Sequence, residues 1–114
     1  MPQVTFRVNR EESIVVPVFQ VLGLRDRLRS RLAESAFAAG DALERLLDDP
    51  TVDGVSFEAD EMSEILATIQ FYMGQDDWVG EQVTRVRHDL RDAHDHAGSW
   101  DGVTLTVTVA RDDS

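Results

Sequence analysis

All three histidines of the chain lie within residues 88–96, where they are interleaved with aspartates. On a helix that advances about 100° per residue, His88, Asp92 and Asp95 fall within about 60° of one another. His96 follows Asp92 by one turn, and imidazole and carboxylate ligands at this spacing can hold a divalent transition metal. We call these four residues the histidine ridge and treat them as a candidate metal site. A solvated surface is the interpretation we favour, because nothing local supplies supporting hydrogen bonds, and we expect no cofactor and no catalytic residue.

Four arginines, Arg25, Arg27, Arg29 and Arg31, form the only cationic cluster in the sequence. On a helix, the first and third flank a leucine stripe on one side, and the second and fourth flank it on the other. We favour the interpretation that their stems cover the edge of the core while the guanidinium groups stay in water. The alternative is an anion-binding or protein-binding face that recognises carboxylates, including those of a second copy of this acidic chain.

Paired carboxylates occur in two predicted loops, at Asp48, Asp49 and Asp53 and at Asp76 and Asp77. Neither group has the glycine position or the spacing of an EF-hand calcium loop. We regard Asp76 and Asp77, together with the four arginines, as candidate partner-binding residues. The sequence contains no nucleophile elbow, no P-loop and no GxGxxG fingerprint, so its motifs do not predict an enzyme.

No lysine occurs among the 114 residues, although the chain has 11 arginines and 22 carboxylates. Lysine is normally one of the commonest residues, so a GC-rich genome or adaptation of the whole surface to high salt would explain the bias. The net charge is −11, and residues 51–114 contribute −10 of it, from 4 arginines and 14 carboxylates. This acidity either reflects such a background or steers the chain toward a basic partner. It disfavours direct nucleic-acid binding, which needs a cationic face.

The sequence has no cysteine, which excludes disulfides, thiolate metal sites and cysteine nucleophiles. Its first residues lack the basic start and the apolar run of a secretory signal. The longest uncharged apolar stretch, 13–24, is too short to span a bilayer and contains Pro17 and Gly23. We therefore expect a cytoplasmic protein that does not interact with membranes.

Alternating apolar and polar residues predict four β-strands. They lie at residues 4–8, 14–19, 52–58 and 103–109. Pro17 cannot donate a hydrogen bond to a neighbouring strand, so the second strand is expected at a sheet edge or to end early. The first two strands are expected to form an antiparallel hairpin.

Helical spacing of apolar residues predicts four helices. They lie at residues 22–39, 42–49, 60–73 and 78–97. Gly40 is expected to end the first helix, and Asp41 with Glu44 to cap the second. Asp60 is expected to cap the third helix, and Gly98 to end the fourth. The second helix ends in two aspartates, which oppose the helix dipole, and the neighbouring sequence does not resolve this conflict.

The element order β-β-α-α-β-α-α-β, with strands at both ends and helices between them, predicts a single α+β domain. We expect an antiparallel or mixed sheet of about four strands, covered on one face by helices. The domain should comprise residues 1–110, followed by a disordered acidic tail at 111–114.

The composition favours a small acidic binding protein for a basic macromolecular partner, such as an inhibitor or an immunity-like or antitoxin-like module. Two alternatives stay open. One is a small enzyme or metal-dependent protein that uses the histidine ridge. The other is a self-assembling subunit, in which the arginines of one copy meet the carboxylates of the next.

Overall fold

The computed structural model describes residues 2–76, 78 and 80–111. Within them, four antiparallel strands form one sheet in the order β2-β1-β4-β3. The strands are β1 (Gln3–Val8), β2 (Ile14–Val16), β3 (Gly54–Ser56) and β4 (Leu105–Ala110). The predicted hairpin of the first two strands is confirmed.

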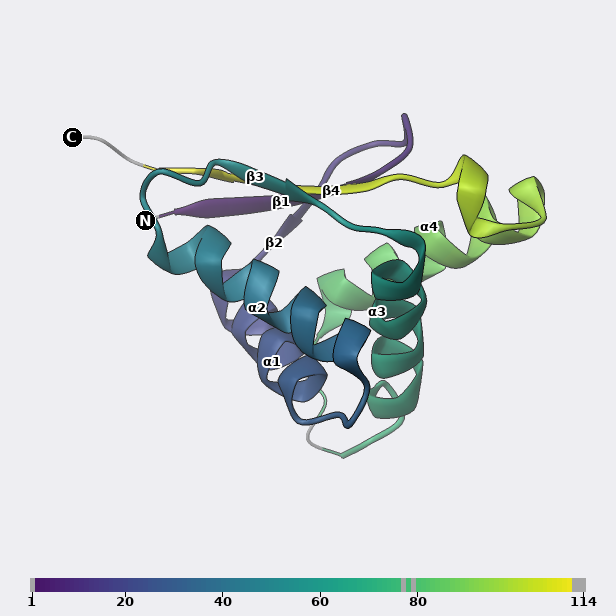
Figure 1. The fold of residues 1–114 in the computed structure, drawn as a ribbon, viewed down its shortest axis with the longest axis horizontal. Coiled ribbons are helices and arrows are strands. Elements are labelled where there is room, and N and C mark those ends of the chain that lie inside the picture. Colours follow the sequence, from purple (N-terminus) through teal and green to yellow (C-terminus); the bar gives the residue numbers. More distant parts are fainter. Residues whose placement is uncertain (1, 77, 79, 112–114) are drawn as a thin grey trace.

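The helices all lie on one face of this sheet, as Figure 1 shows. They are α1 (Val18–Arg29), α2 (Glu34–Asp48), α3 (Ala59–Tyr72) and α4 (Glu81–Ala97). The predicted α+β class, the element order and the one-sided helical cover are therefore confirmed. In the described part of the chain, no helix is both long and apolar enough to cross a lipid bilayer.

The inner face of the sheet is apolar because β1 and β4 alternate. Every second side chain of these strands lies toward the helices and is at most 7 % exposed, namely Val4, Phe6, Val8, Leu105, Val107 and Val109. Phe6 pairs with Val107 across the two central strands. Burial of such side chains contributes about 1.5–3 kcal/mol each, and a register slip of one residue would turn a whole strand's set to solvent.

The two edge strands are shorter than the sequence predicts. β2 ends at Val16, because Pro17 has no N–H for the sheet and instead precedes the first residue of α1. β3 covers only three residues of the predicted 52–58. β4 is shifted slightly toward the C-terminus of the predicted 103–109. The prediction that the strand before Pro17 lies at an edge is confirmed, because its one neighbour in the sheet is β1.

The prediction that one helix covers 22–39 and ends at Gly40 is wrong. α1 ends well before that glycine, and α2 runs through it. At the break, the Ser30 hydroxyl donates to the Arg27 carbonyl at 2.8 Å, a local bond that competes with continuation of the helix. Leu32, which would extend the leucine stripe, is fully exposed in the connection.

Gly40 allows α1 and α2 to approach each other closely. A Cβ at this position would lie 2.6 Å from Cγ of Arg29 and 3.1 Å from the carbonyl oxygen of Arg25. Both distances are shorter than ordinary van der Waals contact, so the helix spacing depends on the absent side chain. Asp41 and Glu44, predicted to cap a helix, lie inside α2 instead, and that prediction is wrong.

Two helices begin at other residues than predicted. α3 is capped by Glu58 and not by Asp60. The Glu58 N–H donates to Oε1 of Glu61 at 2.9 Å, and the Glu58 side chain accepts from the Glu61 backbone in return. α4 begins at Glu81, three residues later than predicted.

The start of α4 is capped by a distant residue. Gly80 precedes the helix and has no side chain to offer, and the buried Gln20 of α1 takes its place. Its Oε1 accepts from the backbone N–H groups of Gln82 and Val83, each at 3.1 Å. Its amide nitrogen donates to the side chain of Gln82. These bonds satisfy N–H groups that a helix start leaves open, and they join α1 to α4.

The end of α4 follows the prediction. Gly98 has a φ of 79°, in the left-handed region that glycine adopts most easily, and its N–H donates to the His94 carbonyl at 2.8 Å. A short 3₁₀ helix, η1 (Trp100–Gly102), then leads into β4. The ring of Trp100 lies 4.5 Å from that of His94, between centroids, and covers this end of the core.

Gly40→Ala tests the close contact between α1 and α2. Alanine is favoured over glycine inside a helix by about 1 kcal/mol, but here its Cβ would meet the backbone of Arg25. We expect the steric clash of the new Cβ to cost more free energy than the gain in helix propensity provides. The substitution should therefore lower the free energy of unfolding by about 1–3 kcal/mol. Urea unfolding measures this change.

The matched control is Gly23→Ala in α1. Its Cβ would meet only the flexible end of Arg27, at 3.1 Å. The control should therefore be neutral or stabilising. Equal effects of the two substitutions would contradict a specific role of Gly40 in helix packing.

Candidate functional site

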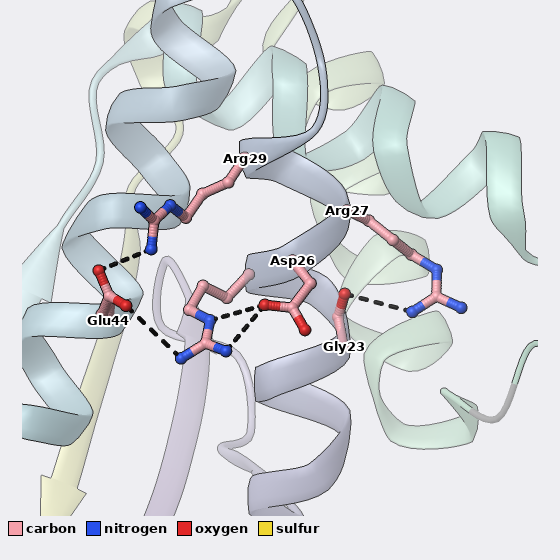
Figure 2. Close-up of polar contacts among 6 residues, drawn as sticks. Gly23, Asp26, Arg27, Arg29 and Glu44 are labelled. Atoms are coloured by element: carbon pink, nitrogen blue, oxygen red, sulfur yellow. Dashed lines mark hydrogen bonds and ion pairs between the residues drawn. The ribbon is translucent and has the colours of Figure 1, made fainter.

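The four arginines of the predicted cluster make contacts with other residues of the same chain. Arg29 donates from Nη1 to Oε2 of Glu44 at 2.7 Å, and Nη1 of Arg25 lies 3.8 Å from Oε1 of the same carboxylate. Arg25 also pairs with Asp26 at 2.8 Å. Figure 2 shows Arg29 turned toward Glu44, with Arg27 on the other side of α1. Arg25 and Arg29 therefore join α1 to α2.

The remaining two arginines contact the third helix and the segment after it. Nε of Arg31 donates to the Glu64 carboxylate of α3 at 3.2 Å. The guanidinium carbon of Arg27 lies 4.9 Å from the ring centre of Tyr72 and 5.3 Å from that of Trp78. A cation at such distances over an aromatic ring contributes about 0.5–2 kcal/mol. Helical spacing places Arg25 and Arg29 on one side of α1 and Arg27 on the other, whereas Arg31 lies beyond the end of this helix.

A partner would have to compete with these internal contacts to reach the cluster. The Arg25 and Arg29 side chains are 20 % and 35 % exposed. Asp76, the next predicted partner-binding residue, is exposed in the loop after α3. Asp77 lies outside the described residues. A partner-binding role for these residues stays a prediction.

The histidine ridge lies exposed on α4. Nε2 of His88 is 3.2 Å from Oδ2 of Asp92, and the two side chains are 70 % and 67 % exposed. Oδ2 of Asp95 lies 4.0 Å from Nε of Arg91, which gives this carboxylate a weak cationic neighbour. Among the residues that the structure describes, no group of three or more histidines and carboxylates is placed to hold a metal ion. The metal site stays a hypothesis without geometric support.

Part of the ridge lines a hollow together with residues from the other end of the chain. Asp89, Asp92 and His96 of α4 line one side, and Asn9 and Glu11 of the β1–β2 turn line the other. The rest of the lining is small, namely Ala93, Ala97 and Gly102. Three carboxylates thus share this space, and no arginine is among its described lining residues. We call it the acidic hollow.

Glu11 and Asp89 are the members that the sequence patterns do not single out. Asp89 precedes Asp92 by three residues and His96 by seven, so helical periodicity alone would have placed these three on one face. Glu11 has no such signal, because its position depends on the packing of α4 against β1 and β2. His88 and Asp95, the other two ridge residues, do not line the hollow.

A second hollow is lined by carboxylates at the starts of α2 and α3, namely Glu34, Glu58, Asp60 and Glu61. Helix N-termini carry a partial positive charge that stabilises negative side chains. Glu58 and Glu61 are in addition engaged in the cap of α3. Asp89 lies at the middle of α4 and Asp92 in its second half, so neither of these carboxylates of the acidic hollow has this compensation.

The C-terminus of α2 is compensated by Arg111. Its Nη2 donates to the carbonyls of Leu46 at 2.6 Å and Asp49 at 2.9 Å, and its Nη1 donates to the carbonyl of Val52 at 2.9 Å. A cation that binds the last carbonyls offsets the helix dipole, which resolves the conflict seen in the sequence. Arg111 is therefore anchored and not part of a loose tail, and residues 112–114 lie outside the described chain.

Hydrogen bonds from a nearby residue favour the charged form of Asp49 at this helix end. The hydroxyl and the backbone N–H of Thr51 donate to its Oδ1 at 2.6 Å and 2.9 Å. These two bonds, followed by the charges of Arg111 and Arg45, hold the pKa of Asp49 below its ordinary value of 3.8.

The chain matches no known protein family, no curated protein sequence and no solved structure.

Asp49→Asn removes the charge of this carboxylate and keeps the Oδ1 acceptor. A lowered folded-state pKa means that ionised Asp49 stabilises the fold above its unfolded-state pKa, and that this contribution is lost as pH falls through the folded-state pKa. We expect the variant to be less stable than the parent at neutral pH and the difference to vanish in acid. Urea unfolding across this pH range measures it. A difference independent of pH would contradict the assignment.

Zinc titration tests the histidine ridge. We expect calorimetry to give a Kd no tighter than about the micromolar scale, because exposed ligand pairs lack supporting hydrogen bonds. His94→Ala serves as the control, since its ring packs on Trp100 and is not part of the ridge. A nanomolar site that His88→Ala abolishes and the control retains would establish a metal site.

Proposed function

We propose that this chain is a small binding module that recognises a basic protein through the acidic hollow. The observation that carries the proposal is the meeting of Glu11 with Asp89 and Asp92 in one hollow without an arginine. A lysine or arginine side chain of a partner would find several carboxylate oxygens there at once, and charge-assisted hydrogen bonds are the stronger kind. An inhibitor or an immunity-like or antitoxin-like module would use such a surface.

The charge of the whole chain supports the same function. The net charge of −11 would attract a basic partner at long range and raise the rate of encounter. The four arginines between 25 and 31 contact acceptors and rings within the chain, so they do not offset carboxylates at the acidic hollow. A cytoplasmic location is part of this proposal.

The two alternative functions have less support. A metal-dependent enzyme would need more ligands than the pairs that the ridge brings together in the described chain. Self-assembly through the arginine cluster would have to break existing contacts with Glu44 and Glu64.

A charge-removal experiment tests the proposal. The variant Glu11→Gln/Asp89→Asn/Asp92→Asn removes the three carboxylates of the acidic hollow, and an arginine-rich peptide serves as the probe. Exposed ion pairs contribute about 0.2–1 kcal/mol each, so we expect the variant to bind the peptide about tenfold more weakly. Calorimetric titration measures the affinity, and added potassium chloride should weaken binding to the parent protein.

The matched control, Glu34→Gln/Asp48→Asn/Asp60→Asn, also loses three negative charges, two of them from the second hollow. It should retain most of the affinity. Urea midpoints of both variants verify that each is folded. An equal loss in the two variants would mean that the peptide responds to net charge alone, and the proposed site would be wrong.

A further inference from the structure

The outer face of the sheet differs in charge from the rest of the molecule. Its side chains are those of the strands that alternate with the buried set, namely Gln3, Thr5, Arg7, Val15, Gly54, Ser56, Thr106, Thr108 and Ala110. None of these described positions is a carboxylate, in a chain that has 22. Figure 1 shows the helices on the other face of the sheet. The acidic character of the chain therefore does not extend to this surface.

A hollow lies on this face beside the β1–β2 turn. In Figure 1 the turn rises from the sheet on the side away from the helices. The hollow is lined by two arginines, Arg7 and Arg10, by Asn9, and by four residues that carry hydroxyl groups, namely Thr5, Ser13, Thr106 and Thr108. Thr5 pairs with Thr108 across β1 and β4, and Arg7 pairs with Thr106. Such partners have Cβ atoms about 4.5–5.5 Å apart, so one small ligand can reach all four.

Neither of these two arginines forms an ion pair with a carboxylate of the described residues. Nε of Arg7 donates to the Glu11 carbonyl at 3.1 Å, and its Nη2 lies 3.5 Å from the Arg10 carbonyl. These neutral acceptors orient the guanidinium without compensating its charge. Among the described residues, no carboxylate oxygen lies within 4.0 Å of either guanidinium.

The chemistry of these donors favours a phosphate group. One edge of Arg7 is engaged by the turn carbonyls, so this arginine has only its remaining N–H groups for a ligand. A tetrahedral phosphate has three acceptor oxygens that can take single hydrogen bonds from a guanidinium and from hydroxyls. The carboxylates of α4 do not line this hollow, and Glu11 of the turn contacts Arg7 through its backbone carbonyl.

We propose that this hollow binds the phosphate group of a small phosphorylated ligand, with Arg7 as its main cationic contact and the threonine hydroxyls as additional donors. The site shares no carboxylate with the acidic hollow. Phosphate binding at this site can therefore be tested independently of the binding of a basic protein at the acidic hollow.

Nuclear magnetic resonance of the full chain tests the proposal. Inorganic phosphate and O-phosphoserine are titrated in parallel at constant ionic strength, with chloride as the reference anion. We expect saturable shifts at the backbone amides of Thr5, Arg7, Thr106 and Thr108, with a Kd on the order of millimolar for so open a site. Tighter binding of O-phosphoserine would identify an esterified phosphate as the ligand.

Arg7→Gln should weaken binding by about tenfold. Arg85→Gln on α4 removes an arginine away from the hollow and should leave the affinity unchanged. Thr108→Val removes a hydroxyl with little change of shape and should weaken binding as well. Shifts that do not saturate, that chloride reproduces, or that Arg7→Gln leaves intact would overturn the proposal. Retained phosphate binding in the acidic-hollow variant would separate this site from the protein-binding function.

Discussion

The structure depends on covering one apolar face of a four-stranded sheet. β1 and β4 turn valine, phenylalanine and leucine side chains to a single side, and a sheet of this kind is stable only when other elements bury that side. The helices meet this requirement together. The opposite face has mostly polar or small side chains, which can stay exposed to water. The alternation of side chains that buries one face of the sheet therefore leaves the other face exposed to solvent.

Helix ends in this protein are completed by residues far away in the chain. Gln20 provides the acceptor that Gly80 cannot offer to α4, and Arg111 binds the carbonyls at the end of α2. Each contact joins elements that are separated by about sixty residues of sequence. The stability of each of these two helices is therefore coupled to the assembly of the whole domain. If the element that carries the capping residue unfolds, the helix that it caps loses these hydrogen bonds.

Charge is sorted by position. Arginines of α1 lie at the joints between helices, whereas three carboxylates meet between the β1–β2 turn and α4, and four more lie at the starts of α2 and α3. Asn9 holds this turn to the strand opposite, because its N–H donates to the Thr104 carbonyl at 2.8 Å and its Oδ1 accepts from the Thr104 N–H at 2.7 Å. The same turn separates the acidic hollow, lined by Glu11, from the outer-face hollow, lined by Arg10. One short segment thus shapes two surfaces of opposite charge.

Patterns within the sequence correctly predict the type and order of the elements, the edge position of the strand before Pro17 and the end of α4 at Gly98. Each of these features follows from the periodicity of apolar side chains or from the backbone properties of a single proline or glycine. The position of Gly40 inside a helix could not be predicted in this way, because a glycine can mark either a helix end or a close contact with a neighbouring helix. Which of the two applies depends on the packing of α2 against α1. The tertiary structure also brought Glu11 to Asp89 and Arg111 to the end of α2, since contacts across the domain leave no periodic signal in the chain.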